Sequence, residues 1–350
     1  MHHLSLKLRV VTEAFANILG GFIENLAGGD AIAASLAGIR HREQAGHKLS
    51  DPIRTIAFAC DPLQLNRLRD RKRHQQHHRA RSHSYCYPIS LNIFPQTVRS
   101  DGDSGLDDNY FSASLTLDQA GNRITLRHSD PGAVQGKVNV RYRIDVPYRT
   151  EVVCIVSRGR QSIRGVLGPV TAKAGIGDIK ASYISKGLQA EVESGNIDLQ
   201  VIGEHVEART NRGNITGERL AQGIDARTGD GDVSLIVVGP STAVVEKGNG
   251  RIDVGGARGA LTCSTEGGDL HVQAVPHGYW KLNSASGVIR LDLPPAANFD
   301  LDISDDSGEI QIERDDLSRP SSDAHRVSQR VGGGDKRIEV HTVTGRITIR

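Results

Sequence analysis

Five carboxylates lie close together near the end of the chain, and paired carboxylates are the groups that cleave glycosidic bonds. They are Asp300, Asp302, Asp305, Asp306 and Glu309. A glycosidase needs two such groups at a defined separation, one of them with a raised pKa. Asp300 and Asp302 alternate with apolar residues and are expected to face solvent, where charge discourages edge-to-edge pairing of strands. We therefore interpret the cluster as solvated surface charge.

A second chemistry suggested by the sequence is calcium binding. Gly229-Asp230-Gly231-Asp232 and Gly248-Asn249-Gly250-Arg251 resemble the nonapeptide repeats of calcium-binding β-rolls in their closely spaced glycines, and the first segment also has acidic residues. Those repeats, G-G-x-G-x-D-x-U-x, must recur every nine residues to complete the ligand cage. Here they do not recur, so the sequence predicts no metal site.

Other catalytic signatures are weak. Ser, His and Asp are plentiful, but no G-x-S-x-G motif occurs. The four cysteines, Cys60, Cys86, Cys154 and Cys263, are not at metal-ligand spacings such as C-x-x-C. Cys154 and Cys263 take inward positions of the repeat described below, and we expect both to be small buried residues without a disulfide. We expect no catalytic residue and no cofactor, and we predict that the protein is not an enzyme.

One basic segment, Arg67–Arg81, interleaves arginines with histidines. It could be a nucleic-acid or anionic-surface arm, a His-rich metal tract, or a solvated segment, and the last reading is favoured. The whole chain has 43 basic and 41 acidic residues. This near balance gives no general reason to expect nucleic-acid binding unless the segment 67–81 is functional.

The elements that would position any site come from a repeat built on glycine. Each unit is a Gly, commonly followed by Asn or Asp and then by Ile, Val or Leu, and successive glycines are 18 to 21 residues apart up to Gly308. The predicted corner glycines are Gly177, Gly195, Gly213, Gly231, Gly250, Gly268, Gly287, Gly308 and Gly345. A fixed period near twenty residues is typical of a stacked repeat protein.

Apolar residues alternate with polar ones on both sides of each glycine. They stand seven and five residues before it, as Leu188 and Ala190 do for Gly195, and two and four residues after it, as Ile197 and Leu199 do. Period-two alternation predicts half-buried strands. Each unit therefore gives two short strands joined at a glycine corner, where glycine adopts a positive φ without a Cβ clash.

Two folds fit this pattern. Reading each Gly-Asn or Gly-Asp as a hairpin turn gives an antiparallel meander. Reading each unit as one coil gives an all-β solenoid of nine or ten rungs, about 4.8 Å apart. The even spacing favours the solenoid, because a meander has no need to keep a period. Trp280, at an inward position, is expected to fill the core.

We divide the chain into three parts. Residues 1–90 form a basic, low-complexity segment, disordered or partly helical over Val10–Ile39. Residues 91–150 form a β cap that covers the first rung, with a hairpin between Phe111 and His128. Residues 151–350 form the solenoid, in which a bulge near Ile163 absorbs one extra residue. A flexible loop at 313–337 interrupts the period, and the last rung is expected to be exposed near Ile347 and Ile349.

The compartment is not fixed by the sequence. Glu13 and Glu24 interrupt the apolar stretch near the start, so it is a poor signal peptide and suggests a cytoplasmic protein. No run of eighteen apolar residues occurs, so no membrane span is expected. An alternative is that part of residues 10–80 is not native protein, the start codon having been placed too far upstream.

The ladder contains VTAKAGIGDIKA, LQAEVESGNIDLQV, VEARTNRGNITG and IDARTGDGDVSL, preceded by VNVRYRIDVP and closed by IEVHTVTGRITIR. Over about residues 107–350 it resembles a bacterial family of β-repeat proteins of unknown function, DUF4097. The resemblance implies a β-solenoid, often attached to envelope proteins, for which adhesion has been proposed. It implies no catalytic residue. The lack of a recognisable secretion signal departs from an exported role.

From these observations we predict a non-enzymatic binding or adhesion-like module with a protein or glycan partner. The outward residues expected to form its binding face are Lys173, Lys180, Glu191, Asp198, Glu207, Arg209 and Arg290. The alternative is a self-assembling scaffold, a homo-oligomer that stacks end to end as bactofilin-like proteins do. A carbohydrate-active enzyme is the third reading.

Overall fold

The computed structural model describes residues 3–10, 90–97, 115–120, 123–129, 138–245, 250–318 and 325–350. All regular structure in these ranges is β-strand. The basic segment 67–81, Cys60, Cys86 and residues 11–39 of the predicted helical stretch lie outside them. In the part that is described, no helix is long and apolar enough to cross a membrane.

The chain divides into two compact units that interleave along the sequence. The first comprises Met1–Val11, Ser112–Gly132 and Tyr148–Arg350, and the second comprises Thr12–Phe111 and Ala133–Pro147. In the second unit, β2 (Ser90–Thr97) pairs antiparallel with β5 (Val138–Asp145). The sequence-based boundaries at residues 90 and 150 stay a prediction.

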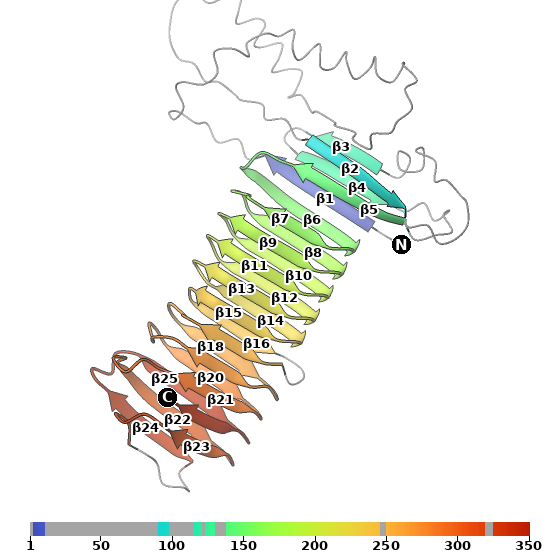
Figure 1. The fold of residues 1–350 in the computed structure, drawn as a ribbon. Coiled ribbons are helices and arrows are strands. Elements are labelled where there is room, and N and C mark those ends of the chain that lie inside the picture. Colours follow the sequence, from blue (N-terminus) through green and yellow to red (C-terminus); the bar gives the residue numbers. More distant parts are fainter. Residues whose placement is uncertain are drawn as a thin grey trace, which may run out of the picture. The chain divides into compact units, whose positions relative to one another are not determined.

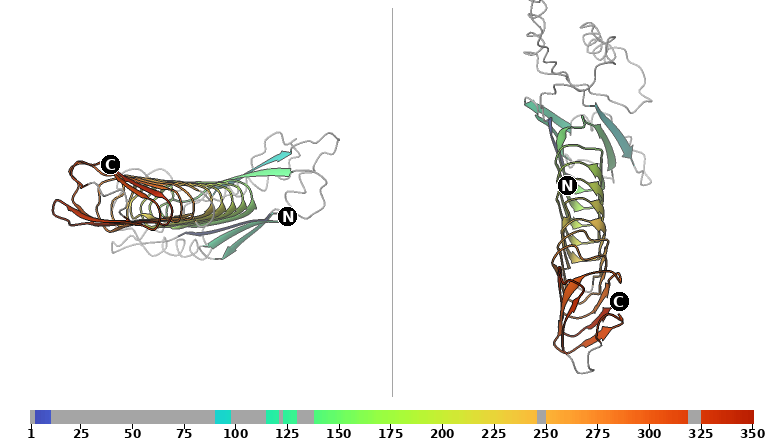
Figure 2. Two further views of the ribbon diagram at one scale, coloured as in Figure 1. Left: turned by 90° about the horizontal axis from the view of Figure 1, so that it is seen from below. Right: turned by 90° about the vertical axis from the view of Figure 1, so that its left-hand side faces the viewer.

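The first unit consists of two facing sheets. The larger sheet contains β1 (His3–Val10), β3 (Leu115–Ala120), β4 (Arg123–Ser129), β6 (Thr150–Arg158), β8 (Val170–Ile176), β10 (Leu188–Ser194), β12 (Val206–Arg212), β14 (Ile224–Asp230), β16 (Ser241–Val245), β18 (Leu261–Thr265), β20 (Trp280–Ser284), β22 (Phe299–Asp305), β24 (Arg326–Val331) and β25 (Arg337–Thr342). The smaller sheet contains β7 (Gln161–Arg164), β9 (Ile179–Ile184), β11 (Ile197–Ile202), β13 (Ile215–Leu220), β15 (Val233–Val238), β17 (Ile252–Gly255), β19 (Leu270–Gln273), β21 (Val288–Asp292), β23 (Glu309–Ile312) and β26 (Arg346–Ile349). Each rung gives one strand to each sheet, and the rungs stack as Figures 1 and 2 show.

Strands of neighbouring rungs run parallel, one repeat apart. Leu188 of β10 pairs with Val170 of β8 on one side and with Val206 of β12 on the other. In the smaller sheet, Ile197 of β11 pairs with both Ile179 and Ile215. The β-solenoid is therefore confirmed, and the antiparallel meander is wrong.

The core lies between the two sheets, and the predicted inward columns fill it. Val170, Ala172, Ile179 and Ala181 of one rung are at most 2% exposed, and equivalent residues of other rungs are also buried. Trp280 is fully buried, and its indole N–H donates to the Gly259 carbonyl at 3.0 Å, so it fills the core as predicted. Cys263 is buried as well, and desolvation raises the pKa of its thiol to about 12.

A further inward column was not predicted from the sequence. Seven residues after the corner glycine stand the buried side chains of Ile184, Ile202, Leu220 and Val238. Just before the first three of these, the residues Tyr183, Val201 and Arg219 have φ near +55°. This left-handed conformation kinks each strand at the same position: it turns one side chain outward and returns the next residue to the core, while neighbouring rungs keep one-to-one register.

The first rung keeps its register without the predicted bulge. Gln161 pairs with Ile179, and Ile163 pairs with Ala181. Gln161 thus takes the inward position that isoleucine holds in the next rungs. It is 4% exposed, and its amide N–H donates to the Lys173 carbonyl at 2.6 Å. The prediction of a bulge near Ile163 is wrong, because Ile163 stands four residues after Gly159, as Ala181 does after Gly177, and no extra residue has to be absorbed.

We call the end of the stack at the first rung, β6/β7, the proximal end. There, three antiparallel strands extend the larger sheet beyond β6. The strand next to β6 is β1, which the sequence analysis did not predict, and β4 and β3 follow it. β3 and β4 pair antiparallel, which confirms the predicted hairpin partners. Pairing with β1 covers the edge of β6, so the large sheet does not end on the first parallel rung.

We call the opposite end of the stack, at β22/β23, the distal end. There, the order of the rungs in the stack differs from their order in the sequence. β25 lies between β20 and β22 in the larger sheet, and β26 lies between β21 and β23 in the smaller one. The last rung in sequence is therefore enclosed by two others, and Ile347 and Ile349 are fully buried. The predicted exposed edge near these residues is wrong. The edges at this end are β23 and β24, and β24 pairs antiparallel with β22.

Candidate binding surfaces

The seven residues predicted to form one binding face lie on two faces. Lys173, Glu191, Glu207 and Arg209 belong to β8, β10 and β12, on the outside of the larger sheet. Lys180, Asp198 and Arg290 belong to β9, β11 and β21, on the outside of the smaller sheet. Because the core separates the sheets, these residues cannot contact one partner surface together.

On the larger sheet the predicted residues pair with one another. The Lys173 ammonium donates to the Glu191 carboxylate of the next rung at 2.5 Å. Arg209 forms an ion pair with Glu207 two residues before it, and the Gln189 amide also reaches Glu207 at 3.4 Å. These side chains already pair with one another along the stack, so contact with a partner would gain less binding free energy from them.

The smaller sheet repeats this arrangement near its proximal end. Lys180 donates to Asp198 at 2.7 Å, again across one rung. Arg290 is five rungs further on, beside His271 in the ladder. Two of the three predicted residues on this sheet therefore pair with each other, and Arg290 lies far from both.

A different set of side chains on the smaller sheet is held outward by the backbone. Tyr183, Val201 and Arg219, the three left-handed residues, stand at the same position of successive rungs, and we call them the left-handed stripe. Tyr183 is half exposed, and the Arg164 guanidinium lies 5.1 Å from its ring centroid. Ile236 of the next rung is also 49% exposed.

Charge within the stripe is fixed by local hydrogen bonds. Both Nε and Nη2 of Arg219 donate to Glu218, at 2.9 and 2.6 Å, and the Gln200 amide donates to Glu218 at 3.2 Å. The bonds from Arg219 are the main reason that the pKa of Glu218 is lowered. The stripe thus presents an aromatic ring, a β-branched side chain and a paired guanidinium in one line.

Further along the smaller sheet, His271 lies between two carboxylates. Its Nδ1 is 3.2 Å from Asp253 and its Nε2 is 2.8 Å from Asp292. One carboxylate therefore lies beside each ring nitrogen. His271 lies on the outside of the sheet, and its ring is held by carboxylates of the two neighbouring rungs.

The acidic cluster near the end of the chain does not form a carboxylate pair open to a substrate. Asp300 accepts from Arg330 at 2.7 Å, and Asp302 lies between Arg326 and Arg337. Asp305, in contrast, is inward and 4% exposed, where it accepts from the Gly308 N–H at 2.7 Å. His325 approaches the same oxygen at 2.9 Å. The interpretation of Asp305 as solvated charge is therefore wrong, because it occupies a corner position held by Thr or Ser in other rungs.

The predicted corner glycines form a column in which the backbones touch. Gly177, Gly195, Gly213, Gly231 and Gly287 have φ between +133° and +149°. A Cβ on Gly213 would lie 2.1 Å from the Gly195 carbonyl oxygen. Both the conformation and the close approach therefore require glycine.

The residue after each glycine links neighbouring rungs. The side-chain oxygen of Asn196 accepts from the Asn214 backbone N–H at 2.9 Å, and that of Asn214 accepts from Asp232 at 2.9 Å. The ladder extends from Asp178 to Arg251, and Asp269 adds a bond to Val288. Asn and Asp at this position serve the next rung rather than only their own turn.

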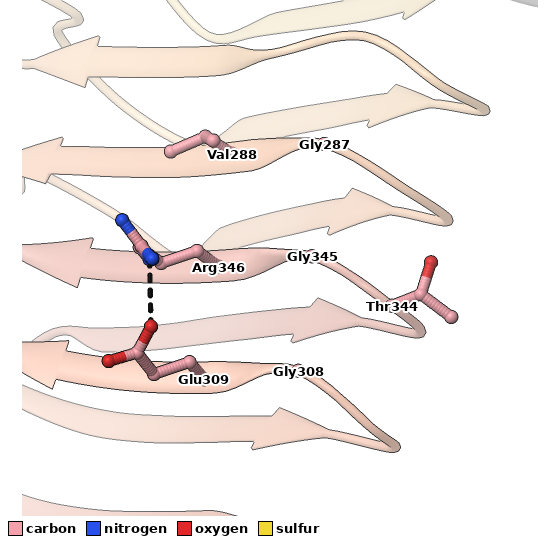
Figure 3. A pocket seen from close by; sticks show the side chains of 7 residues that line it. All are labelled: Gly287, Val288, Gly308, Glu309, Thr344, Gly345 and Arg346. Carbon is pink, nitrogen blue, oxygen red and sulfur yellow. Dashed lines mark hydrogen bonds and ion pairs between the residues drawn. The ribbon is translucent and has the colours of Figure 1, made fainter.

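Figure 3 shows the distal end of this column, where Gly287, Gly345 and Gly308 stack. Beside them lies a shallow hollow of about 400 Å³. It is lined largely by backbone, and the Arg346 guanidinium donates to Glu309 across it at 2.9 Å. No group of three metal-ligating side chains occurs among the described residues, Asp230 and Asp232 included.

Residues 182–350 match the family model described as Toastrack DUF4097. No curated protein and no solved structure matches the chain. The match covers the rungs from β10 onward, together with the end of β9.

Proposed function

Residues 182–350 belong to the Toastrack DUF4097 family, and from that premise we propose that this chain is a non-enzymatic binding module. Its partner is a protein or a glycan that lies along the outside of the smaller sheet. The left-handed stripe is the contact surface. The observation that carries the proposal is the conformation of Tyr183, Val201 and Arg219 in three successive rungs.

Left-handed backbone is costly at these positions. A non-glycine residue held there costs about 1–3 kcal/mol, and a β-branched residue such as Val201 is a clear outlier. Glycine would adopt the same conformation without that cost. Keeping side chains there is expected when the side chains themselves are used, and strain of this kind gathers at ligand-binding sites.

The stripe also differs in chemistry from the predicted faces. Tyr183 is half exposed on the outside of the smaller sheet. Tyr rings bind sugar faces and protein side chains alike, and they lose little conformational entropy on binding. Equal rung spacing of about 4.8 Å suits an extended partner with a regular repeat.

The test uses the full chain and two double variants. Tyr183→Ala/Arg219→Ala removes two side chains of the stripe, and Lys173→Ala/Glu191→Ala removes an ion pair on the opposite sheet as the matched control. Each protein is applied to immobilised glycans and to an array of extended peptides. We expect a ligand whose binding weakens by at least about tenfold, or 1.4 kcal/mol, in the first variant only.

Equal loss in both variants, or no binding by the unaltered chain, contradicts the proposal. Cleavage of a glycan would instead identify an enzyme. Filament growth through the last rung in sequence is not favoured, because both edges of that rung are already paired.

A further inference from the structure

The inserted rung at the distal end lies between two rungs that are consecutive in sequence. The rung consists of Arg337–Arg350, and its neighbours are β20/β21 on one side and β22/β23 on the other. Ile338 pairs with both Trp280 and Leu301. Ile347 pairs with both Ile289 and Ile310. The neighbours therefore form a slot with parallel strand edges in both sheets.

The two walls of the slot have matching patterns. Trp280 and Leu301 face the same inward column, as do Ile289 and Ile310, and all four are buried. The corner glycines Gly287 and Gly308 are aligned as well, with Gly345 between them in Figure 3. Both walls therefore offer the same register to the rung that lies between them.

The slot selects what enters it by shape. Ile338, Val340, Ile347 and Ile349 are at most 1% exposed, so an occupant needs apolar residues at these positions. The corner needs glycine, because a Cβ on Gly345 would lie 1.9 Å from the Gly287 carbonyl oxygen. The occupant is thus an extended segment with alternating apolar residues and one glycine corner.

The slot also selects by charge, and it does so on one wall. Arg346 donates to Glu309 at 2.9 Å, and Arg350 donates to Glu313 at 2.7 Å. Arg337 approaches Asp302 at 3.5 Å. Three acidic residues of the β22/β23 wall therefore face three arginines of the occupant, which fixes both its charge and its register.

The connection to the inserted rung contains a turn suited to a hinge. After β24, residues 332–336 pass to β25, and Gly332 and Gly334 have φ of +59° and +67°. Glycine pairs absorb large backbone changes at low cost. Five extended residues span up to about 18 Å, more than three strand spacings.

We propose that Arg337–Arg350 is an exchangeable donor rung, and that the slot binds this basic, extended segment from a second copy of the chain. In the structure the chain's own segment fills the slot. Exchange between two copies replaces each contact by an identical one, so it costs no contact energy at the slot and produces a rung-swapped dimer. This proposal is independent of the left-handed stripe.

The first test examines exchange at the slot. A protease site is inserted between Gly333 and Gly334 of the full chain, and the folded protein is cut. A fluorescent peptide with the sequence of residues 337–350 is then added in excess. We expect saturable uptake, at least about tenfold weaker for peptides carrying Gly345→Val or Arg346→Glu/Arg350→Glu. The uncut chain, whose slot stays filled, should take up peptide much more slowly.

No uptake over a day by the cut protein overturns the proposal. Equal uptake of the Gly345→Val peptide, or equal uptake by the uncut chain, also overturns it, because the peptide would then be bound elsewhere.

The second test asks whether another copy is the donor. Isotope-labelled and unlabelled full chains are mixed at high concentration and examined by native mass spectrometry. We expect mixed dimers, and we expect them to be lost in a variant that joins β20 to β25 through Ser284→Cys/Thr342→Cys, a directly paired position. Monomers alone at every concentration exclude a second copy as the donor.

Discussion

The rungs from β8/β9 to β14/β15 and those from β16/β17 onward all have a glycine at the corner, but they differ in how they return to the other sheet. In the first group each strand of the smaller sheet has six residues. In the second group these strands have four or five residues. Three of the longer strands, β9, β11 and β13, contain the left-handed residue, and the shorter strands end before that position. A uniform return keeps the 18-residue period, whereas variable loops allow the rung order to change.

The two groups are also stabilised differently. In the first group, hydrogen bonds and ion pairs repeat from rung to rung, as in Asn196–Asn214 and Lys173–Glu191. At the distal end, individual large side chains close the core. Phe299 is fully buried, and the Arg314 guanidinium lies 5.5 Å from its ring centroid. The first group therefore depends on repetition, and the distal end depends on single residues.

The largest effect is expected from the glycine column of the regular group. Gly213→Ala places a Cβ 2.1 Å from the Gly195 carbonyl oxygen and forces a left-handed conformation on alanine. We expect a loss of about 3 kcal/mol or more in the free energy of unfolding, measured by urea denaturation. The control is Gly165→Ala, where φ is +71° but no atom lies within 4 Å of the added Cβ. It should cost about 1 kcal/mol. Equal losses would show that stacking distance does not matter.

Much of the fold that the two groups share could be predicted from the sequence, but the difference between the groups could not. The spacing of glycines and the alternating residues gave the solenoid, the corners and most of the core. The column of Ile184, Ile202, Leu220 and Val238 also recurs in the sequence, seven residues after each corner glycine. Strict alternation from the glycine, however, predicts that side chains at this position face solvent. A left-handed residue changes the face on which the next side chain lies, and the residue types Tyr, Val and Arg do not indicate that conformation.

The inserted rung could not be predicted for another reason. An in-phase repeat says that a rung fits the stack, but every position in the stack accepts the same pattern. The gap of 37 residues between Gly308 and Gly345 shows only that two periods have passed. Pairing order depends on loop reach and on charges across the sheets, such as Arg346 with Glu309. The binding-face prediction failed to account for the same cross-rung pairing.

The next largest effect is expected at Arg314, which is nearly buried. It donates to the Leu293 and Pro294 carbonyls and, through two nitrogens, to Asp316. Arg314→Ala leaves these acceptors unpaired, and we expect a loss of about 3 kcal/mol. Hydrogen exchange should accelerate in β22 and β23 but not in β10 to β13. Arg350→Ala, an exposed arginine with one carboxylate partner, is the control and should change little.

The same residue gives the distal end a dependence on pH. Hydrogen bonds from Arg314 lower the pKa of Asp316 below its ordinary value. A lowered folded pKa adds stability above the unfolded pKa, about 3.9, and that stability is lost as the pH falls through the folded value. Exchange in β22 and β23 should therefore rise below about pH 4, before that of the regular rungs. In Arg314→Ala this difference should disappear; its persistence would assign the effect to other carboxylates.

A smaller effect is expected from the ladder beside the glycines. Asn214→Ala removes the acceptor of the Asp232 N–H, and we expect a loss of about 1 kcal/mol. At the distal end, Val288 interrupts the ladder next to Arg346. Val288→Asn supplies an acceptor there and should stabilise the fold by about 0.5 kcal/mol. If thermal denaturation shows that Val288→Asn destabilises the fold, the hydrogen-bond ladder of the first group cannot be extended to the second.

The smallest effect is expected from the cross-rung ion pairs, although they are the most regular feature of the surface. Lys173 and Glu191 are 42% and 51% exposed, so water screens their attraction. A double-mutant cycle with Lys173→Ala and Glu191→Ala should give a coupling of about 0.5 kcal/mol or less, reduced further at high salt. A coupling above about 1 kcal/mol would mean that repetition along the stack makes such pairs cooperative. The small value instead implies that they mainly set register: a rung shifted by one repeat places Lys173 against Arg209, and like charges would then meet.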